Sequence, residues 1–197
     1  LCTVIFLFLI AYLLYIDVVN TVIRLAVNIS SDLEVAAPTI LGVIILVQLI
    51  GFPSAIIYGR LAKKFGGKRM IFYGILIYSL SIFVVSKIVD ADTTYLMWVV
   101  GVLIGTAQGG IQSVSRSYYA KMVPYEKAND FFGFFSVFGR FAGIFSPFLI
   151  AFFQHEDRLG TNYAVLLLLI PLVLASILLI FVKPPVKEMS SELRTSE

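Results

Sequence analysis

The stretch VLLLLIPLVLASILLIF, residues 165–181, contains no charged side chain and no alternation of polar and apolar residues. Strands of outer-membrane barrels alternate over about ten residues, so this run predicts a helix in lipid. A bilayer core about 30 Å thick requires roughly 20 apolar residues per helix. Runs of this kind predict six membrane spans, over residues 3–27, 38–58, 70–86, 95–118, 131–153 and 163–182.

The composition of the whole chain is that of a membrane protein. Of its 197 residues 59% are hydrophobic and 14% charged, with a mean hydropathy of +0.96, whereas soluble domains are about 25% charged. A single cysteine, Cys2, excludes a disulfide framework, and a single histidine, His155, makes a metal cluster unexpected. We expect no enzyme active site, no cofactor and no nucleic-acid partner.

The distribution of Lys and Arg predicts the orientation, because basic loops tend to stay cytoplasmic. Basic residues collect after the second, fourth and sixth spans, whereas the opposite loops are neutral to acidic. Both termini are therefore expected to be cytoplasmic. Residues 1–183 would form a six-helix transmembrane unit and residues 184–197 a polar cytoplasmic tail. Tyr118 and Tyr119 are expected at the inner membrane interface.

Polar side chains inside the spans provide the main clue to function. In the first span Asp17, Asn20 and Arg24 follow helical spacing and share one stripe. Charged groups at membrane depth are costly and usually face a protein interior or a water-filled cavity. We therefore expect a common aqueous crevice, to which later spans add Gln48, Gln108, Gln112 and Arg140.

Each of these residues also has a structural interpretation. Asp17 is either a protonatable or substrate-binding carboxylate, or a structural acid neutralised by an arginine across the bundle, and we expect its partner on another helix. The arginines could bind an anionic group of a substrate or could lock helices together. The glutamines could bind a substrate or hydrogen-bond between helices.

The six spans divide into two similar sets of three. The first and fourth are striped with polar residues, the second and fifth place Gly or Ser beside Pro, and the third and sixth are apolar all round. This pattern predicts two inverted three-helix repeats, with the third and sixth helices facing lipid.

The loop GRLAKKFGGKR, residues 59–69, resembles the basic loop motif of the major facilitator superfamily, although Lys63 stands where that family prefers an acid. Gly59 is expected to permit tight packing at a helix end and Gly66 a left-handed turn. The cations are expected to anchor the loop against anionic lipid or helix C-termini. The matching residues are Gly59, Lys64, Gly66, Lys68 and Arg69. Arg116, near the cytoplasmic end of the fourth span, is expected to act as a gate or lock.

Three longer segments, YIDVVNTVIRLAVN (15–28), VQLIGFPSAIIYGRLAKKFGGKRM (47–70) and GGIQSVSRSYYAKMVPYEKANDFFGFFSVFGRFAGIFSP (109–147), are similar to the vacuolar amino-acid effluxer family of autophagy permeases and its bacterial relatives. The resemblance implies the C-terminal six-helix half of a twelve-helix secondary transporter, and the chain itself looks like a fragment. A missing N-terminal half or a second copy of the chain would complete it.

The function expected from these observations is transport of small solutes, with amino acids as candidates, by alternating access and with proton coupling. The membrane would be the bacterial cytoplasmic membrane, or the vacuolar membrane in a eukaryote. The alternative is a non-transporting sensor or interaction domain that inherited the transporter fold.

Overall fold

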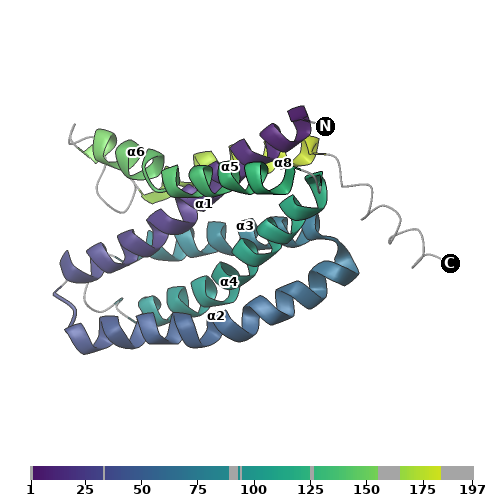
Figure 1. Cartoon of the computed structure of the whole chain (residues 1–197). Helices are drawn as coiled ribbons and strands as arrows, with labels where there is room; N and C mark the ends of the chain where they lie inside the picture. Colours follow the sequence, from purple (N-terminus) through teal and green to yellow (C-terminus); the bar gives the residue numbers. More distant parts are fainter. Residues whose placement is uncertain are drawn as a thin grey trace.

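The computed structural model describes residues 2–32, 34–88, 93, 95–124, 127–154 and 165–182. Across these residues the regular structure is entirely helical, which confirms the predicted all-α membrane fold. The predicted tail and His155 lie outside the described residues. The helices, drawn in Figure 1, are α1 (Cys2–Asp32), α2 (Ala37–Phe65), α3 (Gly67–Val85), α4 (Leu96–Met122), α5 (Ala128–Phe141), α6 (Phe145–Gln154) and α8 (Leu169–Phe181).

The long helices coincide with the predicted spans. Helices α1 to α4 correspond to the first four, and five helical stretches in the described part of the chain are long and apolar enough to cross a membrane. The predicted sixth span is represented by the shorter apolar helix α8. The chain is therefore a multi-pass membrane protein with the architecture of a major-facilitator-type half bundle.

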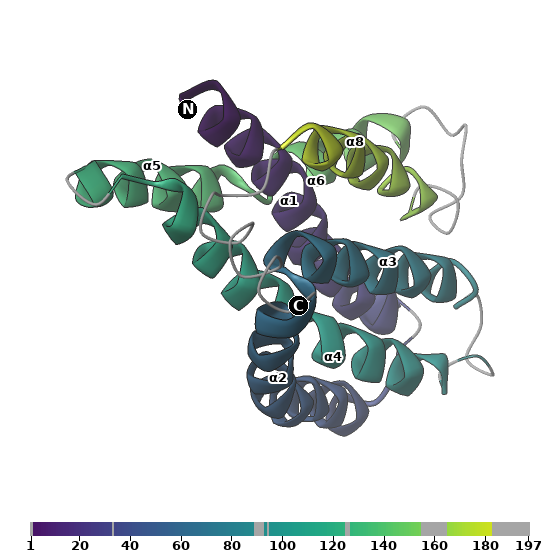
Figure 2. The same ribbon diagram turned by 90° about the vertical axis from the view of Figure 1, so that its right-hand side faces the viewer.

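The second and third helix of each predicted three-helix set pack on the first helix of the other set. Helices α2 and α3 pack most extensively on α4, whereas their counterparts α5 and α8 pack on α1 (Figure 2). Two repeats of three helices, each packing its second and third helix on the first helix of the other, give this arrangement. The contacts thus agree with the predicted three-and-three organisation.

The fifth span is broken, which corrects the expectation of one continuous helix over residues 131–153. Helix α5 ends at Phe141 and α6 begins at Phe145. Gly143, between them, has a φ of +104°, a left-handed conformation that residues with a Cβ rarely adopt. Pro147 follows in the first turn of α6, where the absence of its N–H costs no helical hydrogen bond.

Small residues on α4 bring its backbone close to α2. A Cβ atom added at Gly109 would lie 2.6 Å from the Gly51 carbonyl oxygen, and one added at Gly105 would lie 3.1 Å from that of Val47. Glycines of this kind allow membrane helices to approach closely and pack by van der Waals contact. They explain why the contact between α2 and α4 is the most extensive in the bundle.

The two apolar helices each bury one face, so the expectation that they simply face lipid is only half right. Helix α3 buries Tyr78 and Ile82 but exposes Leu76 and Phe83 on its other side. Helix α8 likewise buries a row of apolar side chains and exposes the opposite face. An all-apolar sequence cannot distinguish the two faces, because lipid and a helix partner accept the same side chains.

An aromatic cluster that includes Tyr119 joins α1, α4 and α5, and the inner-interface position of Tyr118 and Tyr119 stays a prediction. Both tyrosines are buried, and the Tyr119 ring stacks on Phe8 of α1 with centroids 6.0 Å apart. The Tyr119 hydroxyl donates to the Phe131 carbonyl at 2.9 Å. Aromatic contacts of this geometry add about 0.5–1.5 kcal/mol each beyond the buried area.

The basic loop is anchored to the end of α8. The Lys68 ammonium donates to the carbonyl oxygens of Ile180 and Val182, at 2.9 and 2.8 Å. The expected contact of a cation with a helix C-terminus is thus confirmed for Lys68. Gly66 has the expected positive φ, +90°. The packing role expected for Gly59 finds no support among the described residues, because no atom beyond its own helix backbone comes within 4 Å of the position that its Cβ would take.

Candidate functional site

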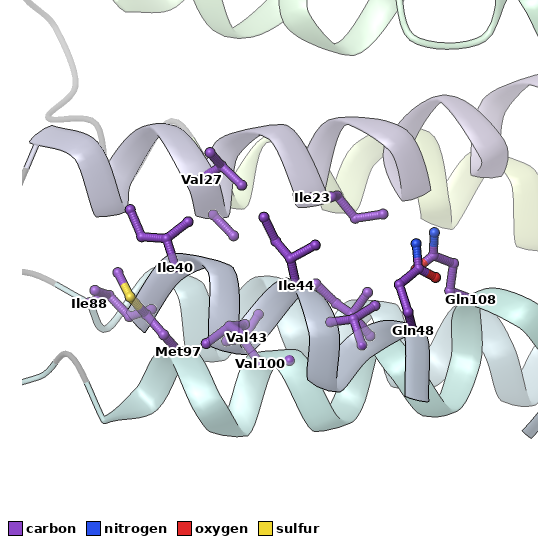
Figure 3. A pocket seen from close by; sticks show the side chains of 14 residues that line it. Ile23, Val27, Ile40, Val43, Ile44, Gln48, Ile88, Met97, Val100 and Gln108 are labelled. Atoms are coloured by element: carbon purple, nitrogen blue, oxygen red, sulfur yellow. The ribbon is translucent and has the colours of Figure 1, made fainter. Parts of the chain in front are cut away.

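A pocket of about 110 Å³ lies between α1, α2 and α4. Its walls are aliphatic, and they include Ile23 of α1, Val43 of α2 and Val100 of α4. Gln48 of α2 and Gln108 of α4 also line it, and Figure 3 shows their amides side by side at one end. Two of the predicted site residues are therefore brought together by the packing of α2 on α4.

The lining of this pocket is uncharged, so its polar chemistry is that of two amides. Each amide offers two N–H donors and one carbonyl acceptor. The volume is comparable to that of apolar cavities of about 150 Å³ that bind molecules such as benzene. The pocket can therefore accept a small apolar group beside a polar one.

Asp17 occupies a different site, at the break in the fifth span. Its side chain is buried on α1, and its two carboxylate oxygens accept hydrogen bonds from the backbone N–H groups of Gly143 and Ser146, at 2.5 and 2.7 Å. The expectation of a partner on another helix is confirmed. That partner is the backbone at the start of α6, rather than the arginine that the structural interpretation supposed.

Two of the predicted arginines lie close to the same break. The guanidinium of Arg24 lies 3.7 Å from the position that a Cβ atom would take at Gly143. Arg140 is in the last turn of α5, just before the break. Both side chains are exposed, whereas Asn20, between Asp17 and Arg24 in the α1 sequence, is half-buried. These residues do not line the pocket between α1, α2 and α4.

The remaining predicted residues of α4 lie beyond the pocket toward the helix end. Gln112 and Arg116 are exposed. The Arg116 guanidinium lies over the ring of Phe132, 5.9 Å from its centroid, within the range of a cation–π contact. This contact ties the end of α4 to α5 and is compatible with the expected lock, which the structure leaves as a prediction.

The structure also shows a polar contact in the core that the sequence analysis did not single out. The buried Tyr15 hydroxyl of α1 donates to Ser115 Oγ of α4 at 2.6 Å, and Ser115 Oγ is itself bonded to the Ile111 carbonyl. The sequence signal for this contact was one polar side chain on each of the two spans, Tyr15 on the first and Ser115 on the fourth. The break at residues 142–144 was also missed, although Gly143 and Pro147 together indicate an interruption.

Comparison with known proteins adds an independent line of evidence. The family described as vacuole effluxer Atg22 like matches residues 2–190. An MFS-type transporter of Bacillus subtilis (strain 168), YxiO, described as uncharacterized, is 42% identical over 177 residues, which are 90% of this chain and 40% of that protein. Autophagy-related protein 22 of Kluyveromyces lactis is 35% identical over 40% of this chain and 16% of its own length.

Autophagy-related protein 22 of Saccharomyces cerevisiae (strain ATCC 204508 / S288c) is 30% identical over 104 residues, which are 51% of this chain and 19% of that protein. The chain thus spans less than half the length of these relatives. The family match covers nearly all of the described helices, from the start of α1 to the end of α8. The chain belongs to the Atg22-like vacuole effluxer family, in a major-facilitator-type fold.

Proposed function

We propose that this chain is the six-helix half of a secondary transporter that moves a small solute by alternating access. The observation that carries the proposal is the pocket between α1, α2 and α4, in which aliphatic walls meet the amides of Gln48 and Gln108. Binding sites of transporters built from repeats lie near the bilayer midplane, between the repeats. Helices α1 and α2 belong to one proposed repeat and α4 to the other.

Amino acids are the solute class that we propose. An aliphatic side chain of the solute would occupy the apolar part of the pocket, and the two glutamines would hydrogen-bond its polar atoms. Arg24 and Arg140 are candidates for its carboxylate, because a guanidinium binds a carboxylate through two parallel hydrogen bonds. Asn20 of α1 and Gln112 of α4, which lie outside the pocket, are further candidate contacts along the pathway.

The pathway needs a second half, and we propose that further sequence of the natural protein supplies it. The Bacillus subtilis relative is more than twice the length of the matched region. Helix α2 exposes a row of large apolar side chains, Leu41, Ile45, Leu49, Phe52 and Ile56. Such a face can contact lipid or the second half of the transporter. The alternative is that a second copy of this chain packs against it.

The test is solute flux in vesicles. The natural protein would be reconstituted into proteoliposomes and loaded with single radiolabelled amino acids, with and without a pH gradient. We expect at least one amino acid with an aliphatic side chain to move faster than in empty liposomes, and a pH gradient to accelerate it. Flux equal to that of empty liposomes for every amino acid would contradict transport and favour the sensor or interaction domain.

A further inference from the structure

The broken fifth span is fastened to α1 through one side chain. Asp17 lies near the middle of α1 in sequence and is buried. Its carboxylate accepts one N–H from Gly143, inside the break, and one from Ser146, in the first turn of α6. Both oxygens therefore accept a hydrogen bond, one from the break before α6 and one from the first turn of α6.

The chemistry of this contact depends on charge. The first N–H groups of a helix have no partner within the helix and carry its positive dipole end, so an ionised carboxylate suits them better than a neutral group does. A neutral amide in the same place would offer one acceptor oxygen and turn an NH₂ donor toward the second N–H. That N–H would then be left without a partner in a low-dielectric environment.

The charged groups around Asp17 leave the backbone as its main partner. The guanidinium of Arg24, on the same helix, lies near Gly143, the residue whose N–H donates to Asp17. Arg140 of α5 and Arg116 of α4 are exposed. Neither α6 nor α8 contains a charged residue within its helical sequence. The two backbone N–H groups are therefore the hydrogen-bond donors to the Asp17 carboxylate, and Arg24 is a cation beside the same break.

Backbone geometry at the break makes this contact specific. Gly143 has a φ of +104°, and in this conformation of the break its N–H donates to Asp17. Ser146 is fully buried, and its hydroxyl has no hydrogen-bond partner among the described residues. The side chain of Ser146 thus does not help to fix the start of α6, which leaves that role to Asp17.

We infer that Asp17 is a positioning residue whose charged carboxylate sets the angle between α5 and α6. Its expected consequence for turnover rests on the proposed transport function, but its structural part does not. An interrupted helix can move in two pieces, so the break is a candidate hinge for movement of α6 during transport. Asp17 would act through α6, and the solute itself would not contact it.

The test measures the angle directly by spin labelling of the natural protein in nanodiscs, without solute. Labels at Phe134→Cys and Ala151→Cys, both exposed positions, report the distance between α5 and α6 in a Cys2→Ser background. We expect a narrow distance distribution for Asp17 and a broad or shifted one for Asp17→Asn. Asp130→Asn, the same change at an exposed acid of α5, is the matched control and should keep the narrow distribution.

Two further variants keep the test decisive if Asp17→Asn fails to fold. Asp17→Glu retains the charge and both oxygens and should keep the distribution close to that of the unmodified protein. Gly143→Ala leaves Asp17 intact but disfavours the positive φ, and should broaden the distribution. The inference would be overturned if Asp17→Asn or Gly143→Ala gave the same distance distribution as the unmodified protein. It would also be overturned if Asp17→Glu gave the same distribution as Asp17→Asn.

Flux measurements separate this inference from the proposed function. If the protein transports, Asp17→Asn should lower the maximal rate about tenfold with KM for the solute unchanged, because the pocket is not altered. A raised KM with an unchanged maximal rate and an unchanged distance between the labels would show that Asp17 binds solute and would overturn the positioning role. If the unmodified protein showed no flux but the variants showed the predicted distance changes, the proposed transport function would be contradicted and the inference about Asp17 would stand.

Discussion

The buried hydroxyl pair Tyr15 and Ser115 shows what a single hydrogen bond does between two helices of this bundle. Tyr15 is fully buried, and Ser115 has a second bond to its own helix. Removing the Tyr15 hydroxyl therefore leaves no orphaned group on Ser115. A hydrogen bond in such a position contributes about 1 kcal/mol net, in lipid as in water.

We predict that Tyr15→Phe destabilises the protein by about 1 kcal/mol, because one bond is lost and no cavity is created. Thermal or SDS unfolding in detergent measures the change. Tyr73→Phe, at an exposed tyrosine of α3, is the control and should be neutral. Equal effects of the two substitutions would mean that the contact between Tyr15 and Ser115 does not stabilise the bundle.

At the scale of helices, the glycines of α4 set the distance between α4 and α2. The Cβ of alanine at position 109 would meet the Gly51 carbonyl oxygen at 2.6 Å, and a backbone atom cannot turn away as a side chain can. The two helices would have to separate. Gly133, on α5, has open space around it and provides a matched comparison.

We predict that Gly109→Ala destabilises the bundle by about 1–3 kcal/mol, the usual cost of overpacking. Gly133→Ala should instead be neutral or stabilising by up to about 1 kcal/mol, because alanine favours a helix. Unfolding in detergent compares the two. If Gly109→Ala were as well tolerated as Gly133→Ala, the close approach of α2 and α4 would be wrong.

The anchoring of Lys68 on α8 gives a prediction for the basic loop. Lys68→Gln removes the cation from the C-terminal carbonyls of α8, a contact worth about 0.3–1 kcal/mol for a charge at a helix end. Amide hydrogen exchange over residues 179–182 should therefore accelerate. Lys63→Gln, at an exposed neighbour of the same loop, should leave that exchange unchanged, and acceleration by both variants would contradict a specific anchor.

The predictability of the fold differs between levels of structure. The helical class and the positions of α1 to α4 were predictable, because apolar runs and charged loops determine them directly. The break after Phe141 was missed because α5 and α6 read as one apolar run, although Gly143 and Pro147 were a signal for it. The positive φ of Gly143 and its bond to Asp17 are seen only in the structure. Hydrogen bonds from backbone N–H groups to a carboxylate cannot be predicted from the pattern of side chains, because every residue except proline has an N–H group.

The candidate site was predictable in part for a similar reason. Polarity at membrane depth singled out Gln48, Gln108 and Asp17, but it could not sort them into separate sites. The structure places the two glutamines in the pocket and Asp17 at the break. The register and rotation of packed helices decide such groupings, and a single sequence does not contain them.

For the whole molecule, the orientation in the membrane remains a prediction that labelling can test. Lys64, at the end of α2, and Tyr95, before α4, are both exposed and are expected on opposite sides. In a Cys2→Ser background, Tyr95→Cys should react with a membrane-impermeant thiol reagent in intact cells. Lys64→Cys should react only after permeabilisation. The reverse pattern would invert the proposed topology.

The central claim is that solute enters the pocket between α1, α2 and α4 during transport, and uptake kinetics of pocket variants test it most directly. Gln108→Leu removes one amide from the lining. We predict a KM raised by up to about tenfold, equivalent to about 1.4 kcal/mol, with little change in the maximal rate. Asn129→Leu, at an exposed amide of α5, should not change KM. An unchanged KM for Gln108→Leu, in a protein that still transports, would contradict the claim.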